Sequence, residues 1–245
     1  PAIPQDTTDR NRTSPLAFTG NKFEFRMAGS SQSIAGPVTV LNAIMADELS
    51  RFSAELEDAD NFNDALHCLI KKAFTDHRRI VFNGNGYDSA WIAEAKRRGL
   101  ANLRNTAEAL PTYILPKNIE LLTRQGVYTY EEIMARHGIH IEKYCKVIHI
   151  EAATLVDIVQ HGIISAVSEY EEKLCSTIAA KYAAIPGAPH HVETSLVNAL
   201  CILNDELLEK TVELKTAIET VNPNAAAEEL LDYYHNQVEK KTAEV

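Results

Sequence analysis

Apolar residues recur every three or four positions along two long stretches in the second half of this sequence. The first stretch runs from 148 to 178 and the second from 196 to 221. This spacing places the apolar side chains on one face of an α-helix, and that face must be buried against another element. A Pro-Gly-Ala-Pro loop at 186–189 separates the stretches, and proline ends a helix. We therefore predict two long helices that pack as an antiparallel hairpin over 148–221.

Each stretch has a defined apolar stripe. The first stripe consists of Ile148, Ala152, Leu155, Val159, Ile163, Val167, Tyr170, Leu174 and Ile178. The second, which is close to heptad spacing, consists of Leu196, Leu200, Leu203, Leu207, Leu214, Ile218 and Val221.

The same spacing predicts further helices at about 37–57, 62–77, 89–98 and 224–241. Asp88 or Ser89 is expected to cap the third of these at its start, and Gly99 at its end. The middle of the chain, 100–146, is expected to form shorter pieces broken by Pro111, Pro116, Gly126 and Gly138. Only Lys22 to Met27 alternates as a strand would. The chain is therefore predicted to be mainly helical, with one short strand near its N-terminus.

Charge and composition exclude several classes of protein. Lys and Arg total 24 against 34 Asp and Glu, and the net charge of -10 argues against a nucleic-acid or anionic-membrane surface as partner. No apolar run approaches the roughly 20 residues of a membrane span, and the first residues do not resemble a secretory signal. We expect no nucleic-acid partner and no membrane. The chain also opens without methionine, which suggests that it belongs to something longer.

The cysteines and histidines admit catalytic or metal-binding interpretations, and we weigh these against simpler ones. The four cysteines are widely spaced in apolar-periodic segments, which favours reduced, buried thiols in a cytoplasmic protein. Cys145 with His149 could form a nucleophile pair, but a buried thiol is the commoner case. The His137/His140 and His190/His191 pairs have no third ligand at convincing spacing, so exposed or capping histidines are favoured and no metal is assigned.

A turn at 80–89 imitates a dinucleotide-binding motif. Ile80-Val81-Phe82 is followed by Gly84-x-Gly86, but Ser89 occupies the third glycine position and no second strand with an acidic end follows. A helix-entry turn is favoured over a nucleotide-binding oxidoreductase.

The predicted strand carries a row of charges. A period of two places Lys22, Glu24 and Arg26 on one face, opposite an apolar face. By periodicity alone this row is a solvated charge ladder on an edge strand, as in a non-catalytic helical interaction module. The less favoured alternative is that the row presents a cation, a carboxylate and a guanidinium to a ligand.

The amino-acid sequence of this region resembles a known enzyme family. Asn11-Arg12-x-Ser14, followed by Lys22-Phe23-Glu24-Phe25-Arg26, resembles the late active-site segment of glutamine synthetases. The longer strings around both motifs look like the type III branch, and Phe82 to Asp88 resembles the C-terminal extension of that branch. Two positions depart from the commoner bacterial pattern, because Ala17 and Lys22 stand where arginines are usual.

The resemblance implies a division of the chain and a role for each matched residue. Residues 1–57 would end an α+β catalytic domain, and 58–245 would form a helical C-terminal extension. Glu24 would be a ligand of Mg²⁺ or Mn²⁺ on the nucleotide side, and Lys22 would contact the nucleotide phosphates. Arg12 would contact the transferring phosphoryl group, and Arg26 would hold the glutamate side-chain carboxylate.

The resemblance also implies an activity. Glutamine synthetases join L-glutamate and ammonia with ATP, through a glutamyl phosphate intermediate, in a cytoplasmic homo-oligomer. A dodecamer of two stacked hexameric rings is the expectation for the type III branch. The other parts of such a site would precede Pro1, so we expect this chain alone to be inactive.

Overall fold

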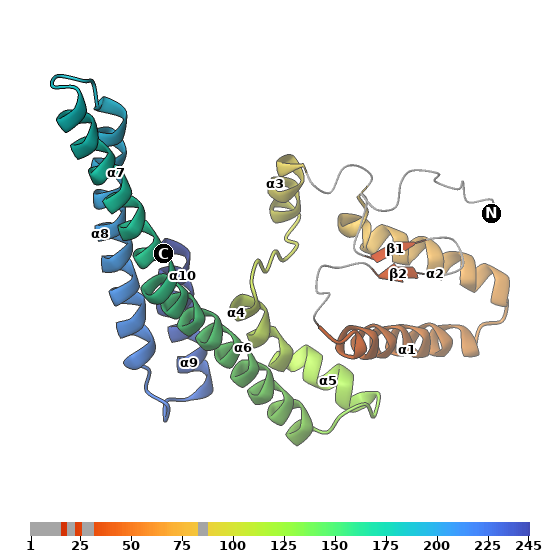
Figure 1. Cartoon of the computed structure of the whole chain (residues 1–245). Coiled ribbons are helices and arrows are strands. Elements are labelled where there is room, and N and C mark those ends of the chain that lie inside the picture. The colour runs from red at the N-terminus through yellow and green to blue at the C-terminus, as the bar shows by residue number, and fades with distance from the viewer. Residues whose placement is uncertain (1–15, 19–22, 26–31, 83–87) are drawn as a thin grey trace. The chain divides into compact units, whose positions relative to one another are not determined.

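The computed structural model describes residues 32–82 and 88–245, and the backbone of 16–18 and 23–25. The chain divides into two compact units (Figure 1). Unit 1 comprises 1–105 with 115–130, and unit 2 comprises 106–114 with 131–245. The chain is mainly helical, which confirms the predicted class. The predicted domain boundary at 57/58 concerns the family's domains and stays a prediction.

Two short strands lie in the N-terminal part of unit 1. β1 (Leu16–Phe18) pairs antiparallel with β2 (Phe23–Phe25), and Glu24 stands opposite Ala17 in the register. β2 falls inside the segment whose alternation predicted a strand. β1 was not predicted, because three residues are too few to display a period of two. The membership of β2 in a catalytic domain stays a prediction.

Three helices of unit 1 begin and end close to their predicted limits: α1 (Ala35–Glu57), α2 (Phe62–Asp76) and α3 (Ser89–Arg97). The 3₁₀ segment η2 (Arg78–Ile80) and α5 (Pro116–Arg124) had no predicted limits. The Asp88 side chain accepts a hydrogen bond from the Ala90 N–H, as predicted for a cap of α3. Gly99 and Gly126 follow α3 and α5 with φ of 70° and 64°, which glycine adopts without strain.

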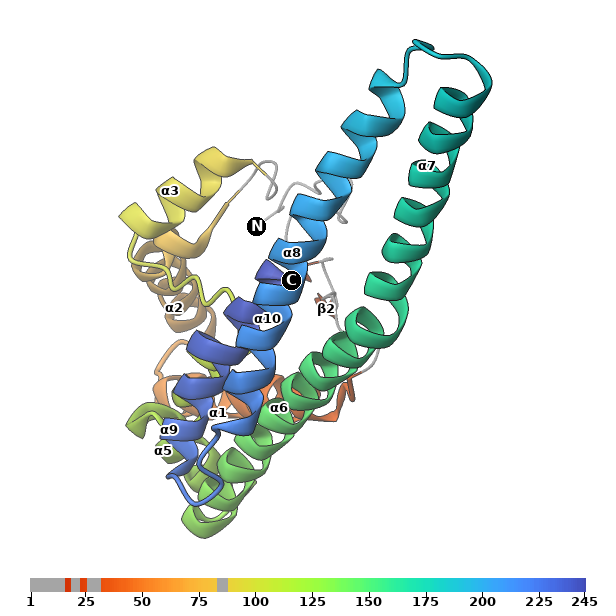
Figure 2. The same ribbon diagram turned by 60° about the vertical axis from the view of Figure 1, so that its left-hand side comes forward.

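Unit 2 is built on one long helix. The helix consists of α6 (Tyr130–Ile158), the π-helical segment η4 (Val159–Ile163) and α7 (Ile164–Ala184). The chain then reverses at 185–190, and α8 (His191–Glu219) runs back beside α7 (Figures 1 and 2). The remaining elements are α4 (Thr106–Ala109), η3 (Leu110–Ile114), α9 (Ala227–Tyr233), the π-helical η5 (Tyr234–Glu239) and α10 (Lys240–Glu244).

The expected break at Gly138 was wrong. α6 begins at Tyr130 and passes through Gly138 without interruption. A glycine inside a helix costs about 1 kcal/mol relative to alanine, which is too little to end one that buries a continuous face. That face includes Ile133, Ile141 and Cys145, all buried. Packing therefore overrides the local preference, and the helix begins 18 residues earlier than the predicted start at 148.

The core of unit 2 joins α6, α8 and the α9–η5 segment. Its buried members are Ile141, Cys145, Ala152, Val156, Leu214, Leu231, Tyr234 and Val238. On α8 only part of the predicted stripe is buried, because Leu214 is fully buried and Leu203 is 59% exposed, and the polar Thr211 is buried on the same face. The Thr211 hydroxyl is accommodated by donating to the Leu207 carbonyl at 2.7 Å. Thr211 lies at helical spacing between Leu207 and Leu214, so the predicted stripe is buried near Leu214 and exposed at Leu203 and Leu196.

Two expectations about polar side chains were also wrong. Only Cys145 is a buried thiol, whereas Cys68, Cys175 and Cys201 are exposed. His137, expected to be exposed or capping, is 3% exposed inside α6. Both errors have one cause: they depend on which face of a helix a residue occupies, and a small shift of the buried face reverses the answer.

One stretch of the α6–α7 helix is long and apolar enough, by length and composition alone, to cross a membrane. This differs from the expectation that no apolar run reaches that length. Ala152 and Val156 of the same helix are buried in the core of unit 2. Glu151 and Asp157 are exposed on it, and carboxylates are costly in hydrocarbon. The stretch therefore fits a helix that packs one face in unit 2 and exposes both apolar and charged side chains on the rest of its surface.

The two leucines of the α8 pattern give a direct test of the buried face. Leu214 is fully buried and Leu203 is 59% exposed, although the sequence pattern treats them alike. Leu214→Ala should lower the free energy of unfolding by about 2–5 kcal/mol, because it removes buried methyl groups and leaves a cavity. Leu203→Ala is the matched control and should change it by less than about 0.5 kcal/mol. Urea denaturation measures both, and equal losses would contradict this placement of α8.

Candidate functional site

The residues matched to the synthetase motif fall mostly outside the described part of the chain. Arg12, Lys22 and Arg26 lie outside the described residues. Of Glu24 the structure describes the backbone alone, in β2 opposite Ala17. Their predicted roles in binding metal, phosphate and glutamate therefore stay predictions.

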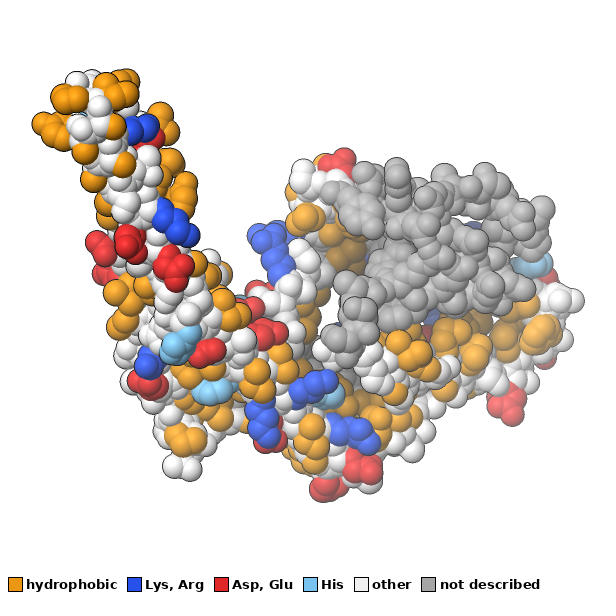
Figure 3. All heavy atoms as spheres, in the orientation of Figure 1, with side chains coloured by type: hydrophobic (Ala, Val, Ile, Leu, Met, Phe, Trp, Pro, Cys, Tyr) orange, Lys and Arg blue, Asp and Glu red, His pale blue; other side chains and the backbone are white. Residues whose placement is uncertain are grey.

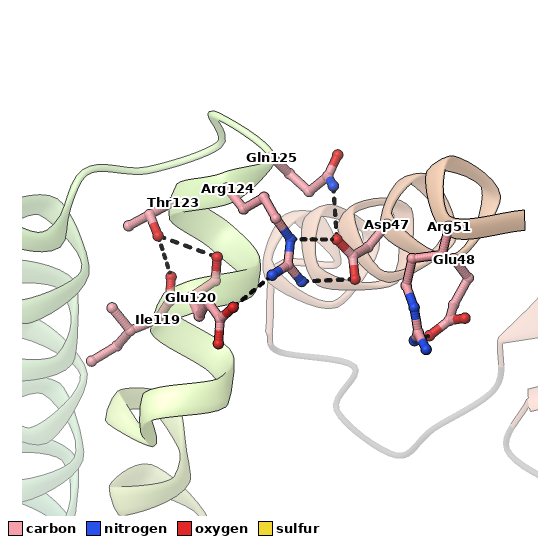
Figure 4. Close-up of polar contacts among 8 residues, drawn as sticks. All are labelled: Asp47, Glu48, Arg51, Ile119, Glu120, Thr123, Arg124 and Gln125. Atoms are coloured by element: carbon pink, nitrogen blue, oxygen red, sulfur yellow. Dashed lines mark hydrogen bonds and ion pairs between the residues drawn. The ribbon is translucent and has the colours of Figure 1, made fainter. Parts of the chain in front are cut away.

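The polar cluster best defined in unit 1 lies on α1, the helix that follows β2. Asp47 of α1 is 8% exposed, which is unusual for a carboxylate. Its two oxygens accept hydrogen bonds from Arg124 of α5, at 2.9 Å from Nε and 3.0 Å from Nη2 (Figure 4). Gln125 Nε2 donates a third bond at 2.9 Å. Such a bidentate pair fixes both distance and orientation between the two helices.

Electrostatics agree with this geometry. Hydrogen bonds from Arg124 and then Gln125 lower the pKa of Asp47. Arg124 also donates to Glu120 at 2.7 Å, so one guanidinium serves two carboxylates. Sequence reasoning missed the cluster, because Asp47 and Arg124 lie 77 positions apart and follow no shared period.

Unit 2 contains the Cys145–His149 pair considered as a nucleophile. His149 Nδ1 lies 3.1 Å from the Tyr234 hydroxyl, which is therefore its hydrogen-bond partner. Burial raises the pKa of the Cys145 thiol, which favours the unreactive protonated form. Both residues line a largely apolar cavity of about 390 Å³. The geometry supports the simpler interpretation of Cys145 as a packed thiol.

Metal ligands do not gather in the part of the chain that the structure describes. Among residues 32–82 and 88–245, no three His, Cys, Asp or Glu side chains are placed to hold an ion. His137 lies in the interior of α6, and its ring stacks on Tyr113 with centroids 6.5 Å apart. Glu193 binds Lys181 and so joins the ends of α7 and α8.

Comparison with known proteins places the chain in a family. Residues 65–182 match the glutamine synthetase C-terminal domain. The chain is 41% identical to the type-3 glutamine synthetase of Dictyostelium discoideum over 181 residues, which are 73% of this chain. It is 33% identical to a glutamine synthetase of Butyrivibrio fibrisolvens over 237 residues, 96% of the chain. The chain belongs to the glutamine synthetase family.

The matches cover the C-terminal portion of these relatives. The chain spans a quarter to a third of their length: 25% for the Dictyostelium protein and 34% for the Butyrivibrio protein. A glutamine synthetase of Bacteroides fragilis strain YCH46 is 36% identical over 182 residues, which are 73% of the chain and 25% of that protein. The predicted type III resemblance is thus confirmed at the level of the family and of the portion matched.

The family match gives the Asp47 cluster a place in the protein. Arg124 lies inside the matched glutamine synthetase C-terminal domain, and Asp47 precedes it in the chain. The bidentate pair therefore ties α1, the helix directly after the strand with Glu24, to α5 within that domain. The pair therefore has a structural role in unit 1, because it holds α1 against α5.

The Asp47–Arg124 pair predicts a specific loss of stability. Asp47→Asn should lower the free energy of unfolding at neutral pH, because an amide cannot accept two charge-assisted bonds from a guanidinium. Arg124 lowers the pKa of folded Asp47 below its ordinary value of 3.8. The stabilisation is therefore fully present above pH 3.8 and is lost as the pH falls through the lower folded value.

The difference in unfolding free energy between the wild-type chain and Asp47→Asn should accordingly be constant near neutral pH and shrink in acid. Glu48→Gln is the matched control, because Glu48 is the next residue and forms an exposed pair with Arg51 at 2.8 Å. Denaturation at a series of pH values measures both variants. A loss in Glu48→Gln equal to that in Asp47→Asn would refute the special role of the buried pair.

Proposed function

We propose that this chain forms part of an ATP-dependent glutamate–ammonia ligase that makes glutamine through a glutamyl phosphate intermediate. Family membership carries the proposal, since the matched relatives are glutamine synthetases. The motif Asn11-Arg12-x-Ser14 with Lys22 to Arg26 adds the residues that the reaction would use. Phosphorylation of the glutamate side chain would convert a poor leaving group into a good one before ammonia attacks.

Each motif residue would act where charge must be held. Arg12 would stabilise negative charge on the transferring phosphoryl group, and Lys22 would contact the nucleotide phosphates. Arg26 would orient the glutamate side-chain carboxylate through the planar fork of its guanidinium. A planar fork distinguishes Arg26 from Lys22, whose ammonium acts as a point charge.

The carboxylate of Glu24 is a suitable donor for a hard divalent cation. Mg²⁺ and Mn²⁺ prefer oxygen ligands, and the bound ion would neutralise charge on the ATP phosphates. One carboxylate leaves most of an octahedral shell unfilled. We therefore propose that this chain by itself does not turn over, and that the rest of the site comes from other parts of the protein.

Unit 2 would serve assembly of a ring-built homo-oligomer. Apolar side chains are exposed around the turn between α7 and α8 and along both helices (Figure 3). They include Tyr182, Ile185, Val192 and Leu196, each at least 42% exposed. Such apolar surface favours contact with another protein surface. This observation also supports the alternative of a non-catalytic oligomerisation module.

A cytoplasmic location is proposed for the parent enzyme.

Two substitutions in a longer form that carries the whole catalytic domain separate the proposed roles. Glu24→Gln should raise the divalent-ion concentration needed for activity and depress turnover, because it removes a negative charge from the metal ligand set. Arg26→Lys should chiefly raise the apparent KM for glutamate, because it keeps the charge but loses the fork. Metal titrations and glutamate kinetics measure the two effects.

The controls for this experiment lie in the same segment. Thr19→Ser changes a residue between the two motifs to which no role is assigned, and it should behave as wild type. The 245-residue chain should give no glutamine under the same conditions. If Glu24→Gln and Arg26→Lys both retain wild-type kinetics, the row of charges is a solvated ladder and the assignment fails.

The proposed assembly has its own test. The longer enzyme should sediment as a dodecamer of two stacked hexameric rings. Tyr182→Lys with Val192→Lys would place charges on the exposed apolar surface of α7 and α8, and should reduce assembly if that surface is buried between subunits. Analytical ultracentrifugation measures the distribution. A stable, active wild-type monomer would contradict a ring-built enzyme.

A further inference from the structure

Two Arg-Arg pairs from separate elements of unit 1 line one hollow. Arg78 and Arg79 form the start of η2, and Arg97 and Arg98 end α3. The hollow has a volume of about 540 Å³, and its other lining residues are Val81 and Glu94. This volume is in the range of small-molecule sites and exceeds what a single water or chloride needs.

The α3 side of the hollow is fixed by hydrogen bonds. Glu94 accepts from Arg97 Nε at 2.7 Å and from Arg98 Nε at 2.5 Å. Hydrogen bonds from Arg97 and then Arg98 lower the pKa of Glu94 to about 2, so this carboxylate is ionised at neutral pH. Arg98 Nη1 also donates to the carbonyls of Arg79 and Val81, at 3.3 and 2.9 Å. Arg98 thereby ties the η2 segment to α3.

An aromatic pair, Trp91 and Phe82, helps to hold Arg98 in place. The Arg98 guanidinium carbon lies 5.3 Å from the centroid of the Trp91 ring. Trp91 in turn stacks on Phe82, with centroids 3.8 Å apart. A cation over an indole face is attracted by the ring quadrupole. The positions of Arg98 and of the backbone that it holds are therefore set before any ligand arrives.

The η2 side of the hollow carries charge that no carboxylate of the described chain pairs with. Arg79 Nη1 lies near Gly99, since a Cβ built there would be 3.7 Å from it. Within residues 32–82 and 88–245, neither Arg78 nor Arg79 pairs its guanidinium with a carboxylate. Four guanidinium groups against one carboxylate leave a local net charge of about +3 in a chain whose total is -10.

Helix termini account for only part of this charge. α2 and α3 both end beside the hollow, and each helix C-terminus carries a partial charge of roughly -0.5. Subtracting both still leaves about two positive charges. Moreover, the negative C-terminus of α3 interacts favourably with Arg97 and Arg98, which lie at that end of the helix. Arg78 and Arg79 are left with five donors each and no anionic acceptor in the described chain.

We propose that the hollow formed by Arg78, Arg79, Arg97 and Arg98 binds a phosphate-bearing small molecule. Guanidinium forks match phosphate oxygens in a bidentate manner, and two adjacent pairs can engage more than one phosphate group. Arg78 and Arg79 are the ligating residues, whereas Arg98 positions them. The proposal uses residues other than those of the Arg12 and Lys22 motif, and it does not depend on the ligase proposal.

The single tryptophan of the chain provides a probe of this site. Trp91 contacts Arg98, so occupation of the hollow should change its fluorescence. The 245-residue chain is titrated at fixed ionic strength and without divalent metal, using orthophosphate, tripolyphosphate and, by calorimetry, ATP. Wild type should bind at least one of them with a dissociation constant of about 1 mM or lower. If orthophosphate binds most tightly, the ligand of the hollow is free phosphate. If tripolyphosphate and ATP bind with equal affinity, the hollow recognises a polyphosphate chain. If ATP binds more tightly than tripolyphosphate, it recognises a nucleotide.

Variants decide whether binding occurs in the hollow. Arg78→Gln with Arg79→Gln should weaken binding at least about tenfold, because each lost charge-assisted bond is worth about that factor. Arg51→Gln with Lys72→Gln removes the same charge from exposed positions of the same unit and should change affinity by less than about threefold. Circular dichroism should show unchanged helicity in both.

A further variant separates this site from the proposed catalytic motif. Lys22→Gln should leave the Trp91 response unchanged, even if it reduces activity in a longer enzyme. The proposal is overturned if wild type does not bind any of the three anions, if the Arg78/Arg79 double variant binds as tightly as wild type, or if the Arg51/Lys72 control loses as much. Loss of response in Lys22→Gln would likewise assign binding to the motif instead of the hollow.

Discussion

Unit 2 depends on the burial of one continuous face of the α6–α7 helix. α6 contributes Ile141, Cys145, Ala152 and Val156 to a core completed by α8 and the α9–η5 segment. In proteins, most of the stability of a helix comes from packing its apolar face, and intrinsic helix propensity contributes less. That burial explains why Gly138 does not end the helix and why the polar Thr211 is enclosed with its hydroxyl bonded to the backbone.

Helical periodicity predicted the elements better than it predicted their contacts. The limits of α1, α2 and α3 lie within about two residues of those expected, because capping residues such as Asp88 and Gly99 mark them locally. Only part of the predicted α8 stripe is buried, with Leu203 exposed. An apolar stripe shows which face of a helix can be buried, but not along which part of its length another helix covers that face. The partner helices decide it.

The functional residues divide in the same way. Glu24 and Arg26 are predicted as site residues because a motif places them at fixed local spacing, and such spacing is visible in one sequence. The Asp47–Arg124 pair spans 77 positions and has no local pattern. The four arginines of the hollow lie in two short basic runs, and in the sequence each run resembles the basic residues that commonly end a helix. Only the fold brings the two runs together.

Net charge describes the whole chain and not its sites. A total of -10 argues against broad binding to nucleic acid, and yet it is compatible with a local excess of about +3 beside α3. Screening makes this possible, because exposed charges interact weakly beyond a Debye length of about 8 Å at physiological ionic strength. A small anion within the hollow would therefore respond mainly to the guanidinium groups that line it. The acidic remainder of the chain would chiefly slow the approach of such an anion, so affinity and approach rate would depend on different residues.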